Sequence, residues 1–241
     1  FPGSTHSYEL HVWSPQWMEI DTATVPPTIR PVTRTPVCPK PADAVNITAT
    51  VVHNAGTEIS AVKLMYAVGP TNKVYQAVDM ARQGQTADYK AQIPAQADRS
   101  FVHYYVEATD VNGNKDAFPI YATGKAPYFY KVNNTGCAVE DIQYTVIDMY
   151  GDKEDLFSSG YRDHKVTNVT AIVTASPAGD NLGYCYAQQP GRTSWAGIQL
   201  TGGIANLNVG DSLTILDADV SEYFGRTQLT NVNVTNHGPA K

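Results

Sequence analysis

The sequence predicts an all-β protein in which a β-sandwich is followed by a small five-stranded Greek-key barrel. Apolar residues recur at every second position in several runs between residues 42 and 134 and again beyond residue 164, as in strands with one buried face. Turns that contain asparagine and glycine separate these runs, and no helical periodicity competes with them. The chain of 241 residues is long enough for two domains, and the pattern predicts a separate core in each. Its 42% hydrophobic and 17% charged residues fit a folded protein.

The first 41 residues are expected to form an N-terminal arm and a proline-rich linker. Residues 26–41, PPTIRPVTRTPVCPKP, are dense in proline, which lacks an amide donor and favours extended backbone. Such a stretch is either a semi-rigid linker between domains or a segment that runs along the edge of a sheet. The sequence leaves both alternatives open.

Residues 42–134 are expected to form the sandwich. β-Branched and aromatic residues alternate with polar ones in four runs, which are VNITATVVH, SAVKLMYAV, SFVHYYVEA and APYFYKV. The turns between them, such as HNAGTE and DVNGNK, contain residues that accept left-handed backbone. About seven short strands in a segment of this length are typical of a β-sandwich.

Residues 138–239 are expected to form the barrel. Five further runs are strand-like, namely KVTNVTAIVTAS, GYCYAQQ, SWAGIQL, GDSLTILDADV and RTQLTNVNVT. Glycine-rich connections separate several of them, and Gly210 marks the turn into the fourth run. Five strands with such connections indicate a small Greek-key barrel of the OB type.

Both segments resemble known modules. ADAVNITATVVHNAGTEISAVKLMYAVG and FVHYYVEATDVNGNKDAFP resemble the immunoglobulin-like and fibronectin-type-III-like modules of secreted bacterial proteins. VTNVTAIVTAS, GYCYAQQPGRTSWAGIQL, LNVGDSLTIL and VSEYFGRTQLTNV are similar to the OB-fold module of bacterial secreted nucleases and surface proteins. The resemblances imply an immunoglobulin-like β-sandwich, an OB-like barrel, and a secreted or cell-surface bacterial protein in which such modules accompany a catalytic domain.

The chain departs from that OB pattern at three positions. Gln189 stands where the family has an aspartate after the second strand. Ala171 and Ala218 stand where it has glycines, so the sequence leaves open how sharply the first and fourth strands bulge there. Modules of this family are not known to supply the chemistry, and the resemblance therefore assigns no catalytic residue.

The net negative charge is confined to the second half of the chain. Residues 1–136 carry 11 Lys and Arg against 11 Asp and Glu, whereas residues 137–241 carry 6 against 12 and account for the net charge of -6. An acidic domain repels a phosphate backbone, which argues against general nucleic-acid binding by that half. No apolar run reaches the length of a membrane-spanning helix, so no membrane insertion is expected.

The three cysteines, Cys38, Cys137 and Cys185, exclude a fully paired set within the chain. Cys38 and Cys137 flank the predicted sandwich, so a disulfide between them would join its two ends. Sequence spacing alone does not establish that pairing, because it does not fix the distance between the two Cα atoms. Cys185 lies in an apolar run and is expected to be a small buried residue.

The candidate ligand-binding residues are aromatic and basic residues of the predicted barrel. Tyr223-Phe224-Gly225 interrupts an alternating run, and the period of two predicts that only one of the two rings faces solvent. In the first interpretation one ring fills the barrel end, the other covers a neighbouring strand or the first domain, and the glycine permits a closing bend. The alternative is a stacking platform for a base or a sugar ring. The members of that platform would be Tyr184, Tyr186, Arg192, Trp195, Tyr223, Phe224 and Arg226.

No catalytic residue and no cofactor is predicted. The chain lacks the GxSxG, HExxH, P-loop and dinucleotide-binding motifs, and no partner constellation accompanies His164. An acidic cluster could ligate calcium, although a solvated acidic loop explains it as well. Its carboxylates are Asp148, Asp152, Glu154 and Asp155.

The function expected from the sequence is that of non-catalytic accessory or binding modules in a larger secreted or cell-surface protein. They would act in spacing, docking or ligand recognition, with other domains of the same polypeptide as partners. In the alternative, the OB-like module binds single-stranded nucleic acid or a glycan for an extracellular nuclease or other hydrolase.

Overall fold

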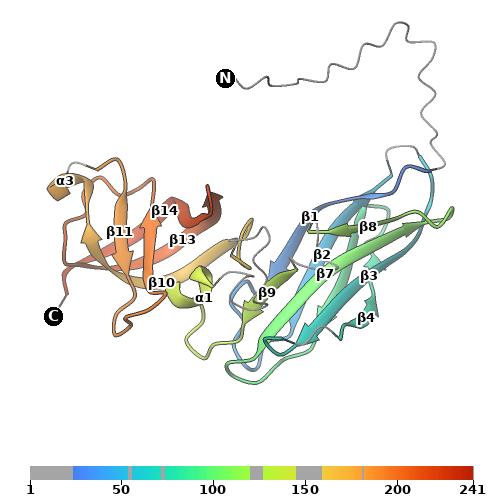
Figure 1. Ribbon diagram of the computed structural model, residues 1–241, viewed down its shortest axis with the longest axis horizontal. Coiled ribbons are helices and arrows are strands. Elements are labelled where there is room, and N and C mark those ends of the chain that lie inside the picture. Colours follow the sequence, from blue (N-terminus) through green and yellow to red (C-terminus); the bar gives the residue numbers. More distant parts are fainter. Residues whose placement is uncertain are drawn as a thin grey trace, which may run out of the picture.

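The computed structural model describes residues 24–53, 56–71, 74–119, 127–144, 159–180 and 182–240. Strands dominate these residues, and they form sandwich sheets and a closed barrel, which confirms the predicted all-β fold class. The sandwich and the barrel lie beside each other along the long axis of the molecule (Figure 1). The part of the chain described here contains no helix of the length and apolarity needed to cross a membrane. The expected N-terminal arm at residues 1–23 lies outside the described residues.

The sandwich consists of two sheets whose facing sides carry the predicted alternating residues. One sheet has the order β1-β2-β6-β5, and the other has the order β4-β3-β7-β8, with β9 also paired to β7. The alternation predicted for β2 is confirmed, because every second residue from Val45 to Val51 is buried. The strands are β1 (Thr28–Thr35), β2 (Val45–Val52), β3 (Ile59–Val68), β4 (Gln76–Asp79), β5 (Ala81–Arg82), β6 (Asp88–Ile93), β7 (Phe101–Asp110), β8 (Lys115–Phe118) and β9 (Tyr128–Lys131).

The proline-rich stretch supplies the edge strand β1 of the first sheet. β1 pairs antiparallel with β2, and the register shifts between Ile29 and Val32, around Pro31. An edge position suits proline because one side of the strand needs no amide donor there. Of the two alternatives left open by the sequence, the edge-running segment is therefore the observed one, and the sheet begins before residue 42.

The barrel closes in the order β10-β11-β12-β14-β13, with β12 and β14 parallel and the other neighbours antiparallel. All five strand-like runs predicted for this half are strands. Small and branched apolar side chains fill the interior, from Val166 in the first strand to Val232 in the last. The elements are α1 (Val139–Gln143), β10 (Lys165–Ala175), α3 (Pro177–Asp180), β11 (Cys185–Gln188), β12 (Gly197–Leu200), β13 (Asp211–Tyr223) and β14 (Arg226–Pro239).

The long barrel strands contain left-handed backbone at residues that the sequence did not single out. Asn168 in β10 and Asn231 in β14 have positive φ angles of 56° and 51°. The register of β13 against β14 shifts between Ile215 and Asp219, opposite Asn231. Asparagine tolerates left-handed backbone better than most residues, so these positions adopt it without glycine, and the chain has alanine at positions 171 and 218.

The two units share one apolar core, whereas the sequence pattern predicts two separate ones. The buried apolar residues form a single cluster that runs from the sandwich into the barrel. Tyr128 and Tyr130 of β9 and Tyr161, which precedes β10, are nearly inaccessible and lie in this cluster. The expectation of separate cores is wrong at this junction, because the connecting segments are themselves aromatic and become buried between the units.

Arg34 of β1 lies at the centre of the junction and is only 2% exposed. Its guanidinium lies 5.1 Å from the ring centre of Tyr130 and 4.8 Å from that of Tyr161. It also donates hydrogen bonds to the carbonyl oxygens of Val37 and Phe129, at 3.0 and 3.1 Å. Ring faces and carbonyl oxygens thus stabilise a buried cation that no carboxylate pairs with among the described residues. Arg34 therefore links the sandwich edge to the segment that enters the barrel.

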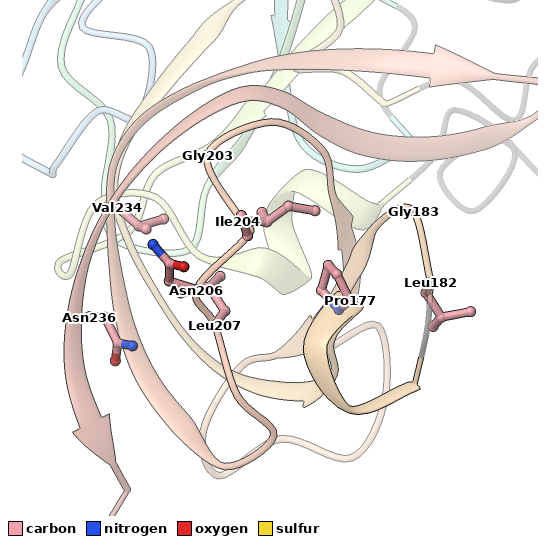
Figure 2. A pocket seen from close by; sticks show the side chains of 10 residues that line it. Pro177, Leu182, Gly183, Gly203, Ile204, Asn206, Leu207, Val234 and Asn236 are labelled. Atoms are coloured by element: carbon pink, nitrogen blue, oxygen red, sulfur yellow. The ribbon is translucent and has the colours of Figure 1, made fainter.

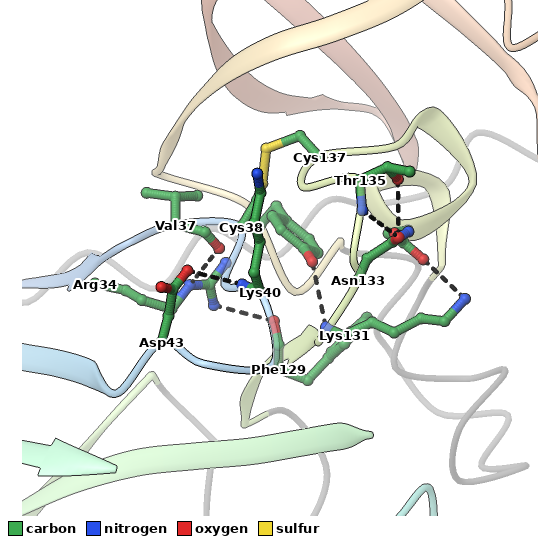
Figure 3. Close-up of a disulfide and its surroundings, with 12 residues drawn as sticks. Arg34, Val37, Cys38, Lys40, Asp43, Phe129, Lys131, Asn133, Thr135 and Cys137 are labelled. Carbon is green, nitrogen blue, oxygen red and sulfur yellow. Dashed lines mark hydrogen bonds and ion pairs between the residues drawn. A yellow bond between two sulfur atoms is a disulfide. The ribbon is translucent and has the colours of Figure 1, made fainter. Parts of the chain in front are cut away.

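A disulfide joins Cys38 to Cys137 beside this junction (Figure 3). The two Cα atoms lie 5.1 Å apart, although the cysteines are 99 positions apart in sequence. The pairing that the sequence left open is therefore present, and it connects the end of β1 to the residues just before α1. Cys185 is free and buried in β11, as predicted, and burial raises the pKa of its thiol to about 11.

Candidate ligand-recognition edge of the barrel

The β13–β14 hairpin ends in a two-residue turn formed by Phe224 and Gly225. Tyr223 and Arg226 form the last pair of the hairpin, and the φ angles of Phe224 and Gly225 are 49° and 75°. Two successive positive φ angles are those of a type I′ turn, whose twist matches that of the flanking strands. Gly225 therefore serves the turn, and the predicted role in a barrel-closing bend is wrong.

Both aromatic rings at this hairpin tip face solvent. Tyr223 is 54% exposed and Phe224 is 94% exposed. Their ring centres lie 4.8 Å apart with the planes at 85°, and the Arg226 guanidinium lies 5.6 Å from the centre of the Tyr223 ring. The prediction that one ring fills the barrel end is therefore wrong, because alternation of sides stops where the turn begins.

Phe224 is an unfavourable residue for the fold at this position. A type I′ turn favours asparagine, aspartate or glycine at its first central position. A residue with a bulky side chain in left-handed backbone costs about 1 to 2 kcal/mol. Burial of the Phe224 side chain offsets little of this conformational free energy, since nearly all of the side chain is accessible. The fold alone does not account for an aromatic residue here.

Trp195, in the loop between β11 and β12, is a second aromatic residue with left-handed backbone and an exposed side chain. Its φ angle is 56°, and 46% of its surface is exposed. Its ring stacks on Tyr144, which follows α1, with ring centres 5.8 Å apart and planes at 21°. Tyr144 was not among the residues predicted from the sequence, because it lies before the barrel strands and only the folded chain brings it to Trp195.

The strand register places Trp195 and Phe224 at the same end of the barrel. β12 and β14 are parallel neighbours, with Gln199 opposite Gln228. Trp195 and Phe224 each lie four residues before these paired glutamines, so both loops project beyond the same end of adjacent strands. We refer to Tyr144, Trp195, Tyr223 and Phe224 as the aromatic edge.

The other two predicted aromatic residues lie elsewhere. Tyr184 and Tyr186 are half-buried and contact each other edge-to-face, with ring centres 5.3 Å apart. Tyr186 lies opposite Gln199, in the middle of β12, and the residue before it, Cys185, faces Leu200. Because β11 runs antiparallel to β12, Tyr184 lies toward the end of the barrel opposite Trp195. The seven predicted residues therefore do not form one platform.

The two predicted arginines differ in their electrostatic surroundings. Arg226 lies over Tyr223, with no carboxylate paired to it in the described part of the chain. Arg192 forms an ion pair with Glu140, with 3.0 Å between Nε and Oε2 and a second contact of 3.1 Å from Nη2 to Oε1. Lys131 also approaches Glu140 at 3.9 Å and lies 5.8 Å from the ring of Tyr144. Glu140 thus offsets much of the positive charge near Trp195.

A cavity of about 630 Å³ lies at the opposite end of the barrel (Figure 2). Leu182, Ile204 and Val234 contribute apolar surface, and Asn206 and Asn236 contribute amides. Gly203 borders it with a φ angle of 65°, and a Cβ atom there would collide with the carbonyl oxygen of Val232. Among the described residues, none of the predicted ligand-binding residues and no charged residue lines this cavity.

The described residues contain no group of three or more His, Cys, Asp or Glu placed to hold a metal ion. The calcium candidates Asp148, Asp152, Glu154 and Asp155 lie outside the described residues. His164 is buried beside Tyr104 and Arg34, and burial lowers its pKa to about 3. A histidine in this state is neutral and inaccessible, so its surroundings match a structural role.

No protein-family model and no curated protein matches the chain. Three solved structures align with most of it at low similarity. An uncharacterized protein from Listeria monocytogenes, solved in complex with alpha-D-glucose, beta-D-glucose, magnesium and calcium, shows 14% identity and a TM-score of 0.30 over 88% of this chain and 18% of that one. A cycloalternan-forming enzyme from the same organism shows 14% identity and a TM-score of 0.31 over the same shares of 88% and 18%. A cycloalternan-degrading enzyme from Trueperella pyogenes shows 12% identity and a TM-score of 0.29 over 86% and 32%. The chain thus spans between 18% and 32% of these chains, and likeness at such TM-scores supports no inference about activity.

Proposed function

We propose that the chain is a non-catalytic accessory part of a larger secreted or cell-surface protein and that the aromatic edge of its barrel recognises a ligand. The observation that carries this proposal is the exposure of two aromatic residues, Trp195 and Phe224, in left-handed backbone at the same barrel end. Non-glycine residues held in strained backbone cluster at functional positions. The disulfide between Cys38 and Cys137 supports an oxidising, extracytoplasmic location.

The junction supports a role in which the two units act as one scaffold. The buried Arg34, the ring contacts around it and the disulfide all connect the sandwich to the segment entering the barrel. Such contacts restrict relative movement of the units and hold the aromatic edge in a fixed orientation to the sandwich. Rigid elements position binding residues more accurately than mobile ones do.

A glycan is the ligand class that the charges favour. Aromatic rings stack on the apolar faces of sugar rings as well as on bases, so the rings alone do not discriminate. The negative charge of the barrel half and the pairing of Arg192 with Glu140 disfavour a polyanion. These charges therefore argue against single-stranded nucleic acid, the other ligand considered for the OB-like module.

The test is calorimetric titration of the whole chain with neutral oligosaccharides and, at low salt, with an oligonucleotide. Trp195→Ala and Tyr223→Ser are each expected to weaken oligosaccharide binding about tenfold or more, since burying one aromatic ring contributes about 1.5 to 3 kcal/mol. Val209→Ala is the matched control, because Val209 is an exposed apolar residue at the opposite barrel end.

Binding that is equally strong in the Trp195 and Tyr223 variants would place the ligand elsewhere and refute the role of the aromatic edge. Preferential binding of the oligonucleotide would refute the glycan assignment. Absence of binding to either class would count against recognition by this edge altogether.

A further inference from the structure

A second pocket, of about 430 Å³, lies at the junction of the sandwich and the barrel. Its walls come from β1, through Arg30 to Thr33, and from Phe118 of β8 and Tyr128 of β9. Asp163, in the turn that precedes β10, contributes the wall on the barrel side. We refer to it as the junction pocket. It shares no residue with the aromatic edge.

Two opposite charges line the junction pocket without pairing with each other. The Arg30 guanidinium lies 5.3 Å from the ring centre of Phe118, and no carboxylate pairs with it among the described residues. The Asp163 carboxylate accepts one long hydrogen bond, 3.5 Å from the Tyr128 hydroxyl, and no cation pairs with it in the described part of the chain. Arg30 and Asp163 are both exposed. A ligand that carried both charges could therefore reach both groups.

Asp163 is held firmly although it lies in a turn. Its φ angle is 64°, and its amide donates to the carbonyl oxygen of Val220 at 3.1 Å. Arg162, the preceding residue, donates to the carbonyl oxygen of Ser159 and lies 4.8 Å from the Tyr128 ring centre. The barrel wall of the pocket is thus fixed against β9, which keeps the carboxylate of Asp163 opposite β1.

The remaining surface of the pocket is apolar. Pro31 and Val32 contribute aliphatic atoms, and Phe118 contributes a ring on which Arg30 already lies. Small-molecule sites commonly combine such an apolar lining with a few polar groups that fix orientation, and their volumes begin at about 300 Å³. The junction pocket therefore fits a small molecule with two charged groups and one apolar group.

We propose that the junction pocket binds a free α-amino acid with an apolar side chain. Arg30 binds the α-carboxylate through its paired N–H donors, which match that group in shape. Asp163 binds the α-ammonium group, and the side chain lies against Phe118 and Pro31. A neutral sugar would leave both charged groups without a partner of opposite sign, so the charge pattern favours the zwitterion.

The test is ligand-observed NMR titration of the whole chain with leucine, N-acetyl-leucine and leucinamide, with glucose as a further probe. Leucine is expected to bind, whereas the acetylated form, which lacks the ammonium, and the amide, which lacks the carboxylate, bind at least tenfold more weakly. Arg30→Gln and Asp163→Asn are each expected to weaken leucine binding at least tenfold. Asparagine tolerates the left-handed backbone at position 163, so the second variant retains the turn.

Lys90→Gln is the control, because it removes one exposed charge from β6, away from the junction. Leucine that does not bind, or that binds equally well after either charge is removed, would overturn the proposal. So would glucose binding in the same pocket in place of leucine. Phe224→Asn is expected to leave leucine binding unchanged, which separates this result from the test of the aromatic edge.

Discussion

Replacement of both Cys38 and Cys137 by serine is expected to lower the free energy of unfolding by about 3 to 5 kcal/mol. The disulfide closes a loop with a sequence separation of 99 residues, and closing so long a loop removes much of the conformational entropy of the unfolded chain. Its two ends also fix β1 beside the residues that lead into α1, so the loss affects the junction directly.

The measurement is urea-induced unfolding of the double variant and the wild type without reductant. Dithiothreitol is expected to lower the stability of the wild type toward that of the double variant and to leave the double variant unchanged. A difference below about 1 kcal/mol would contradict the role assigned to the bond, because a loop of this length should contribute more.

Acidification from pH 7 to pH 4.5 is expected to destabilise the protein by about 2 to 3 kcal/mol for each of two buried histidines. Burial lowers the pKa of His103 to about 4 and that of His164 to about 3, below the ordinary value of 6.5 that applies in the unfolded chain. Between pH 6.5 and the folded-state pKa values, these two histidines bind more protons in the unfolded state than in the folded state. The free energy of unfolding is therefore unaffected by the histidines above pH 6.5, and it decreases as the pH falls toward their folded-state pKa values.

Urea unfolding at pH 7, 5.5 and 4.5 measures this dependence. Asp110, Asp211 and Asp217 have lowered pKa values, through hydrogen bonds to their carboxylates, and lose most of their contribution below about pH 4, outside this window. Burial raises the pKa of Glu222, and the single proton that this carboxyl group takes up opposes part of the effect of the two histidines. His164→Gln is expected to reduce the slope by about half, whatever its stability at pH 7. A flat profile between pH 6.5 and 4.5 would show that the two histidines are not buried in neutral form.

The strands were predictable because alternation reflects burial on one face. Ile47 in β2 and Leu64 in β3 are inaccessible at the positions that the alternation gives. β1 was harder to recognise, since its prolines obscure the strand pattern and only pairing with β2 shows that it belongs to the sheet. Arg34 gives no sequence signal for burial, because its partners lie on β9 and near residue 161, far away along the chain.

The candidate site was predictable in composition and unpredictable in arrangement. Trp195, Tyr223 and Phe224 lie at one barrel end, whereas Tyr184, which the sequence grouped with them, lies toward the other. The type I′ turn at Phe224-Gly225 was not predicted, because the sequence signal for such a turn is Asn-Gly or Asp-Gly and phenylalanine is not part of it. The ion pair that offsets the charge of Arg192 was not predictable, because its partner Glu140 lies 52 residues away in sequence.

The structure assigns different physical roles to the two groups of aromatic residues. Tyr128, Tyr130 and Tyr161 are buried at the junction and stabilise the contact between the units. Phe224 is almost fully exposed and Trp195 is about half exposed, and both have left-handed backbone at loop ends. Variants of the first group should therefore alter unfolding, whereas variants of the second should alter binding.

The most direct test of this account is the free energy of unfolding of Phe224→Asn, measured in urea beside the wild type. The substitution places asparagine before Gly225, which is the favoured pair for a type I′ turn. The variant is therefore expected to be more stable by about 1 kcal/mol while oligosaccharide binding decreases. A variant less stable than the wild type by about 1 kcal/mol or more would contradict the account, because Phe224 would then serve the fold and not recognition.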